Sequence, residues 1–243
     1  MHMIYYSIRE TLERCSVKPD APYVAVMNIS EWHDLKDSFD MGIDLEMNLS
    51  EIYGTKAEVN YDCLTGTFSI PDRKDLSHDD HQFAFALDEK GVVFIDNSEY
   101  AGNLTEQIRK NKRWKSPSIE RFLYDFLEQI VKSDLRLMEH YEQVLDEQES
   151  LIVSDVNPEY MNCVNSIRRD VRDLRNHYAQ LTDFSQELEE IENGFFADEN
   201  LRYFHLFSHR VDRLYGIVSY LRDYTEQLGD IYHLQLEAKQ NRI

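Results

Sequence analysis

The sequence predicts an α+β fold, in which an α/β head with a mixed β-sheet flanked by helices precedes a long antiparallel helical hairpin and a very long final helix. Short apolar runs typical of strands occupy residues 1–115, whereas apolar residues at helical spacing occupy 116–196 and 197–243. Only 8 Gly and 5 Pro occur among 243 residues, and 30% are charged, which favours long helices over an all-β fold. These three ranges are the predicted head, hairpin and stalk.

The head is predicted to contain strands and short helices. The strand candidates are short runs rich in β-branched and aromatic residues, at 3–6, 23–29, 57–61, 67–70, 83–87 and 92–95. The last two form the clearest hairpin, through the turn 88–91. Helices are predicted at 30–39, with Ser30 as the N-cap, at 44–53, stopped by Gly54, and at 103–112.

The hairpin is predicted from two helical runs. Pro117, Ser118 and Glu120 form a helix-start signal, and apolar residues then recur until 154–158 interrupts the pattern. A second run follows, and Asn193 with Gly194 is expected to end it, since Gly is the usual residue after a helix C-terminus.

The stalk is predicted from apolar positions that alternate steps of three and four. A repeat of about 3.5 residues is typical of helices packed side by side over a long distance. From 198 to 243 such a helix spans roughly 68 Å. The positions are Phe204, Phe207, Val211, Leu214, Val218, Leu221, Thr225, Leu228, Tyr232 and Gln235.

The last eight residues contain no Gly, no Pro and no turn signal, so we expect the helix to continue past Ile243. Lys239 and Arg242 lie where a helix would meet the cytoplasmic face of a membrane. The chain itself has no signal peptide and no window near the ~18 apolar residues of a membrane helix, which predicts a soluble fragment. Its three scattered cysteines indicate reduced thiols rather than disulfides or a zinc cluster.

The segments 221–228, 231–232 and 239–243 resemble the end of the stalk helix in CorA magnesium transporters. The resemblance implies a homopentamer at the cytoplasmic face of the cell membrane, with five stalk helices around a pore. It implies transport of Mg²⁺, with Co²⁺ and Ni²⁺ as further candidates. Asn241 is expected at the pore mouth, where a ring of amide oxygens can hold hydrated Mg²⁺ through its waters.

Two family features are missing from the sequence. The Gly-Met-Asn signature and both membrane helices are expected beyond Ile243, so this chain alone cannot transport. Leu206 stands where many members carry an aspartate that binds a regulatory metal, and leucine cannot bind one. By rough alignment with the family, Asp72 and Asp75 lie near its metal-binding carboxylate of the head, which makes them the metal-site candidates.

The acidic residues of the chain are further candidates for interaction with cations. The net charge of −20 repels nucleic acid and concentrates cations, and we expect no organic cofactor. The cluster His78-Asp79-Asp80-His81 is interpreted as a solvated turn, because adjacent loop residues rarely converge on one ion. Acidic helix faces are either solvated surface or cation-concentrating rings, and comprise Asp146, Glu147, Glu149, Glu187, Glu189, Glu190 and Glu192.

No enzyme motif is present: the sequence has no GxGxxG, P-loop, GxSxG or HExxH pattern. Histidines at helix positions, among them His140, His177, His205 and His209, are interpreted as surface or core residues. The leading hypothesis is the ion-sensing and gating domain of a divalent-cation channel. The alternatives are a zinc-transporting member of the same superfamily and a soluble coiled-coil adaptor with its own C-terminal cap.

Overall fold

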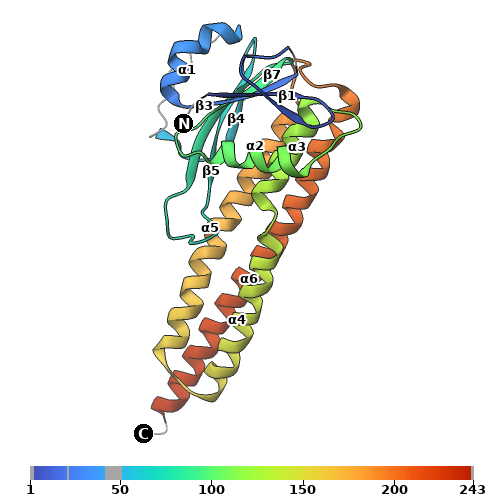
Figure 1. Cartoon of the computed structure of the whole chain (residues 1–243). Helices are drawn as coiled ribbons and strands as arrows, with labels where there is room; N and C mark the ends of the chain where they lie inside the picture. The colour runs from blue at the N-terminus through green and yellow to red at the C-terminus, as the bar shows by residue number, and fades with distance from the viewer. Residues whose placement is uncertain (1–2, 21, 42–50, 242–243) are drawn as a thin grey trace.

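The computed structural model describes residues 3–20, 22–41 and 51–241. A β-sheet head lies at one end, and three long helices run from it to the C-terminus at the other end (Figure 1). The predicted α+β fold is therefore confirmed.

A single seven-stranded sheet forms the head, in the order β2-β1-β3-β7-β6-β5-β4. Every neighbouring pair is antiparallel except β3 with β7, so the sheet is mixed. The sequence did not predict β2, whose short charged run carries little strand signal. The strands are β1 (Ile4–Ile8), β2 (Leu12–Cys15), β3 (Tyr23–Met27), β4 (Lys56–Val59), β5 (Leu64–Ile70), β6 (His81–Leu87) and β7 (Gly91–Ile95).

The central strands are buried on both faces. Successive side chains of a strand point to opposite faces, so β3 sends Val24 and Val26 into one core and Ala25 and Met27 into another. Helix α1 (Ile29–Leu35) and a short 3-10 helix (Lys36–Phe39) cover the second core. The sheet is thus the middle layer between two sets of helices.

The N-cap of α1 differs from the prediction. Asn28, not Ser30, caps the helix: its side chain accepts a hydrogen bond from the Glu31 backbone N–H, and the Glu31 carboxylate accepts from the Asn28 N–H. This reciprocal arrangement satisfies two backbone donors, which a cap at Ser30 without an acid three residues on cannot do. The helix predicted at 44–53 lies largely outside the described residues.

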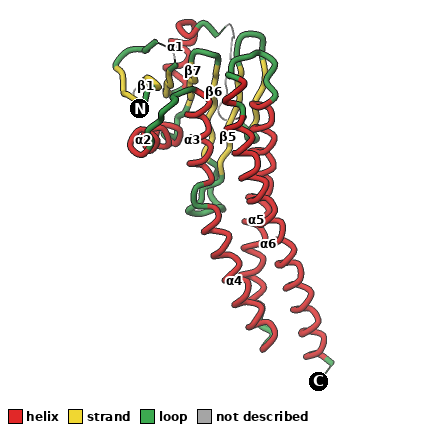
Figure 2. The backbone as a smooth tube through the Cα atoms, turned by 90° about the vertical axis from the view of Figure 1, so that its right-hand side faces the viewer, coloured by secondary structure: helices red, strands yellow, loops and turns green. Residues whose placement is uncertain are grey.

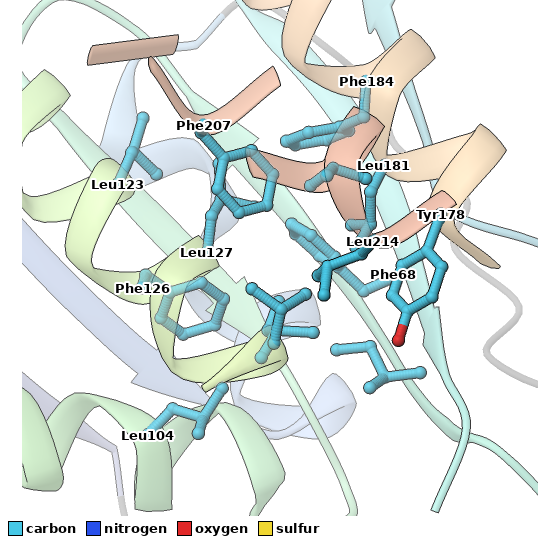
Figure 3. Close-up of a cluster of buried hydrophobic side chains, with 14 of the residues drawn as sticks. Phe68, Leu104, Leu123, Phe126, Leu127, Tyr178, Leu181, Phe184, Phe207 and Leu214 are labelled. Atoms are coloured by element: carbon cyan, nitrogen blue, oxygen red, sulfur yellow. The ribbon is translucent and has the colours of Figure 1, made fainter. Parts of the chain in front are cut away.

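The first core joins the sheet to the long helices. Phe68 of β5 stacks on Phe83 and contacts Phe126 and Phe184, which come from two different helices. Figure 3 shows Phe68, Phe126 and Phe184 with Phe207 and Leu214 in one cluster. One continuous core therefore runs from the head into the helices. The helices are α2 (Tyr100–Asn111), α3 (Ile119–Val131), α4 (Asp134–Ser154), α5 (Pro158–Glu189) and α6 (Arg202–Gln240).

The run predicted from Ser118 is two helices rather than one. Ser118 caps α3 as expected, but the chain turns at Lys132 and Ser133 before α4 begins. Helices α4, α5 and α6 then lie along one another (Figure 2). The second run also ends earlier than predicted, at Glu189 instead of Asn193, although Gly194 does adopt a positive φ of 67°.

Helix α6 confirms the predicted alternating seam. Its positions from Phe204 to Leu228 are buried against the neighbouring helices, and Tyr232 and Gln235 are half-buried. Its 39 residues give a length of about 58 Å. Within the described part of the chain, no helix is both long and apolar enough to cross a membrane.

Candidate functional site

The loop 71–80 between β5 and β6 holds both predicted metal carboxylates. Asp72 Oδ1 accepts a hydrogen bond from the Lys74 backbone N–H at 2.9 Å, and Asp75 Oδ1 accepts from the Ser77 N–H at 2.9 Å. The Ser77 hydroxyl also donates to Asp75 Oδ1, at 2.6 Å. The Lys74 N–H lowers the pKa of Asp72, and the Ser77 hydroxyl followed by the Ser77 N–H lowers the pKa of Asp75, so both carboxyl groups are ionised at neutral pH. The loop fold therefore holds Oδ1 of each carboxylate by hydrogen bonds from the backbone of the loop.

The remaining oxygens face one histidine. His78 Nδ1 lies 3.8 Å from Asp72 Oδ2, and His78 Nε2 lies 3.4 Å from Asp75 Oδ2. The structure thus brings Asp72 and Asp75 together around His78. Two other residues of the His78-Asp79-Asp80-His81 cluster have different partners: Asp80 accepts from the Ser69 hydroxyl, and His81 stacks on Tyr100.

A buried ion pair ties this loop to the helices. Arg73, between the two candidate aspartates, donates from Nε and Nη2 to the two oxygens of Asp134 at 2.9 and 2.8 Å. Asp134 is fully buried at the first residue of α4, and its Oδ2 also accepts the Tyr178 hydroxyl of α5 at 2.8 Å. The loop is therefore fastened to the α3–α4 break and to α5 by charge-assisted hydrogen bonds.

A polar cavity lies beside the loop. It has a volume of about 200 Å³, and His177 of α5 contributes an imidazole that is only 3% exposed. Within the described residues neither ring nitrogen of His177 has a hydrogen-bond partner. Burial, and then the charge of Arg73, holds the pKa of His177 well below its usual value, so the ring is neutral. The other polar lining residues are Ser69, Asp80, Asp173, Asn176 and Gln180.

Part of the acidic face on α4 converges on α6. The Tyr224 hydroxyl lies 2.7 Å from Asp146 Oδ1 and 2.7 Å from Glu149 Oε2. One hydroxyl donates one hydrogen at a time, so the two carboxylates share it. Burial, followed by these two hydrogen bonds, raises the pKa of Tyr224. These two acids therefore hold α4 against α6 as well as carrying charge.

The predicted pore residue lies far from the loop, at the C-terminal end of α6 (Figure 1). Asn241 is exposed at the C-cap of α6, and its N–H donates to the Glu237 carbonyl. Nearby, Lys239 Nζ contacts Asp155 of the α4–α5 turn at 3.3 Å. Leu206 is exposed near the other end of α6 and supplies no ligand. The structure does not bring Asn241 together with Asp72 and Asp75.

The donor set of the loop fits part of a metal site. The Oδ2 atoms of Asp72 and Asp75 suit Mg²⁺, and the His78 imidazole between them suits a transition metal. Across residues 3–20, 22–41 and 51–241, however, no three His, Cys, Asp or Glu side chains are placed to hold one ion. A complete site at the loop therefore needs ligands from water or from a second copy of the chain.

Sequence reasoning missed the groups that anchor this loop. Arg73 stands inside the predicted Asp72–Asp75 segment, but nothing local indicates that its partner is Asp134, 61 residues away. The only local signal was the pair Ser133-Asp134, two residue types that favour helix starts, inside an otherwise helical run.

Comparison with known proteins agrees with this architecture. The family of CorA-like Mg²⁺ transporter proteins matches residues 30–243 of the sequence. The chain belongs to this family. The CorA family consists of transporters, which confirms the prediction that the chain is not an enzyme. No curated protein matches the sequence.

Solved CorA structures share the fold. The complete CorA magnesium transporter from Methanocaldococcus jannaschii is 16% identical, with a TM-score of 0.79 over 99% of this chain and 79% of that chain. The soluble domain of CorA from the same organism is 15% identical, with a TM-score of 0.76 over 96% of this chain and 97% of that chain. The ZntB cytoplasmic domain from Vibrio parahaemolyticus is 10% identical, with a TM-score of 0.73 over 98% and 97%.

Proposed function

We propose that this chain is the ion-sensing and gating domain of a CorA-like Mg²⁺ channel, acting at the cytoplasmic face of the membrane as a homopentamer. The observation that carries the proposal is the link between Asp72 and Asp75 and the helices. Arg73 lies between these candidate ligands, and its ion pair with Asp134 is buried. A change in the charge of the loop therefore acts directly on the point where α4 begins.

The path continues from α4 to α6. Asp134 starts α4, and Tyr178 belongs to α5. Both helices pack along α6, through contacts that include the hydrogen bonds of Tyr224 to Asp146 and Glu149. In the proposed channel α6 is the stalk that leads toward the membrane, with Asn241 near the pore mouth. Displacement of the loop is thus expected to move the stalk.

In the proposal, the binding of divalent cations shifts the equilibrium between the closed and the open state of the pentamer. Each copy has a net charge of −20, so adjacent copies in a pentamer repel one another. Cations bound by Asp72 and Asp75, with ligands from water or a neighbouring copy, offset that repulsion and favour a closed, symmetric state. Loss of the cations allows the stalks to separate and the pore to widen.

The test is a thermal melt of the chain in EDTA and in about 20 mM MgCl₂, a range suited to weak carboxylate sites. We expect Mg²⁺ to raise the melting temperature of the wild type and to have a smaller effect on Asp72→Asn/Asp75→Asn. The control Asp20→Asn/Asp37→Asn makes the same change in net charge at exposed positions and should keep the full response. An equal response from both double variants would contradict the role of the loop.

Zinc transport is the second candidate, and two observations favour it. The fold matches the ZntB domain, and His78 adds a nitrogen ligand between the two carboxylates. Uptake measurements with the intact transporter and either Mg²⁺ or Zn²⁺ would separate the two functions. The adaptor hypothesis has lost its support, because the chain belongs to a transporter family.

A further inference from the structure

Two histidines of α6 face each other at a site that the proposed function does not use. His205 and His209 are four residues apart, so they lie one helical turn apart on the same face. Their Nε2 atoms are 3.0 Å apart, and both side chains are exposed. Two imidazole nitrogens converging from positions i and i+4 are the arrangement with which helices chelate a metal ion.

A carboxylate sets the orientation of one ring. His205 Nδ1 lies 3.2 Å from Oε1 of Glu189, the last residue of α5. When Nδ1 donates its hydrogen to this carboxylate, Nε2 of His205 carries the lone pair. Metal-binding histidines are commonly held in this way by a carboxylate behind them. With this tautomer of His205, Nε2–H of His209 is the donor to the lone pair of His205 in the metal-free chain.

The backbone that carries the pair is firmly held. The neighbouring residues Phe204 and Phe207 are fully buried, and the Ser185 hydroxyl of α5 donates to the Phe204 carbonyl at 2.7 Å. Arg210, the nearest cation in sequence, forms an ion pair with Glu128 of α3. The two imidazoles therefore project from a fixed helical turn, and the cation nearest to them in sequence is already paired.

We infer that His205 and His209 bind a transition-metal ion of the Zn²⁺, Ni²⁺ or Cu²⁺ type, with Glu189 as the carboxylate that positions His205. Nitrogens bonded to Zn²⁺ at tetrahedral geometry lie about 3.3 Å apart, so the pair needs to open by only about 0.3 Å. On binding, the proton of His209 moves from Nε2 to Nδ1, which frees the second lone pair without changing the net charge of the ring.

This site differs chemically from the carboxylate loop. Imidazole nitrogen binds transition metals and not Mg²⁺, which prefers oxygen ligands. The protein supplies two direct ligands from one helix, and water fills the remaining positions. Because Glu189 belongs to α5, the bound metal also strengthens the contact between the end of α5 and the start of α6. The inference does not rest on the proposed transport of Mg²⁺.

The test is calorimetric titration of the whole chain with ZnCl₂ in a His78→Ala background, which removes the imidazole of the loop. We expect one site, whose affinity falls at least about tenfold in His205→Ala and in His209→Ala, and roughly tenfold in Glu189→Gln. An excess of MgCl₂ should not compete. His140→Ala, an exposed histidine of α4 without a histidine one turn away, should leave the affinity unchanged.

A spectroscopic measurement identifies the ligands directly. The electron paramagnetic resonance spectrum of bound Cu²⁺ should show coupling to two imidazole nitrogens in the His78→Ala background and to one after His209→Ala. Melting in EDTA establishes that each variant is folded, as expected for exposed side chains. The inference is overturned if Zn²⁺ does not bind, since the pair is then only a hydrogen bond, or if it binds equally well to His205→Ala and His209→Ala.

Discussion

His177 is a buried histidine whose lowered pKa makes the stability of the fold depend on pH. Its pKa in the folded chain lies well below the value of about 6.5 that an exposed histidine has. Below about pH 6.5 the unfolded chain therefore binds a proton that the folded chain does not. Protonation of the unfolded chain therefore lowers the free energy of unfolding as the pH falls below about 6.5, by at most ~1.4 kcal/mol per pH unit. Above about pH 6.5 His177 is neutral in both states, and the full stability is present.

We predict that His177→Leu makes the loss of stability between pH 6.5 and 5 shallower. The substitution removes the imidazole ring, whose two nitrogens have no hydrogen-bond partners among the described residues. Urea unfolding at several pH values measures the slope. His140→Ala, at an exposed position, should keep the wild-type slope. Identical slopes for wild type and His177→Leu would show that His177 titrates normally in the folded chain.

Asp134 is the residue on which the anchor of the loop depends. Asp134→Asn removes the charge opposite Arg73, whose side chain is only 19% exposed. Breaking a buried pair leaves an uncompensated charge, so we predict a loss of about 3–5 kcal/mol in the free energy of unfolding, measured in urea.

The control for this prediction is an exposed pair. Glu13 lies 3.5 Å from Arg9, and both side chains are more than half exposed. Glu13→Gln should therefore cost about 0–1 kcal/mol. If Asp134→Asn costs no more than Glu13→Gln, the loop is not held by this ion pair.

At the scale of single residues, the sequence indicated which side chains could bind a metal ion but not which residues they contact. Asp72 and Asp75 lie in the loop that follows β5, while their role as ligands stays a prediction. His205 and His209 show the i, i+4 spacing in the printed sequence, yet their partner Glu189 becomes visible only when α5 and α6 are placed together. Contacts between residues far apart in sequence depend on the fold, and local patterns do not contain them.

At the scale of elements, Gly216 tests how much helix propensity contributes to the stability of the long helix α6. A Cβ atom added at Gly216 meets no heavy atom within 4 Å. Gly costs roughly 1 kcal/mol relative to Ala inside a helix, so Gly216→Ala should raise the free energy of unfolding by about that amount. Urea unfolding monitored by helical circular dichroism measures this change.

Gly66 provides the opposite case for comparison. There a Cβ atom would collide with the Lys56 carbonyl of β4 and come within 2.6 Å of the Phe85 ring. Gly66→Ala is therefore expected to destabilise the sheet.

A loss of stability in Gly216→Ala would show that α6 requires glycine at this point for a reason other than the space around it.

The elements were predictable where periodicity was strong. The alternating seam of α6 and the β6–β7 hairpin both follow from apolar spacing and turn residues. The break between α3 and α4 was not predictable in the same way, because apolar residues continue on both sides of it. It is stabilised by tertiary contacts, through Asp134 with Arg73 and Tyr178, rather than by a Gly or Pro.

At the scale of the whole molecule, one core unites the head and the helices. Phe68 of the sheet contacts Phe126 of α3 and Phe184 of α5, so the sheet and the long helices cannot move independently without disturbing shared packing. The sequence predicted both parts from their different periodicities. Their shared core was not predictable, because it depends on which faces meet.

In the proposed function, divalent cations hold copies of this acidic chain together against their repulsion. Sedimentation velocity in EDTA and in about 20 mM MgCl₂ measures this association, at a concentration suited to weak carboxylate sites. We expect Mg²⁺ to shift the wild-type chain toward a five-copy assembly, EDTA to reverse the shift, and Asp72→Asn/Asp75→Asn to respond less. The same distribution of sedimenting species in both buffers would show that Mg²⁺ does not hold the copies together.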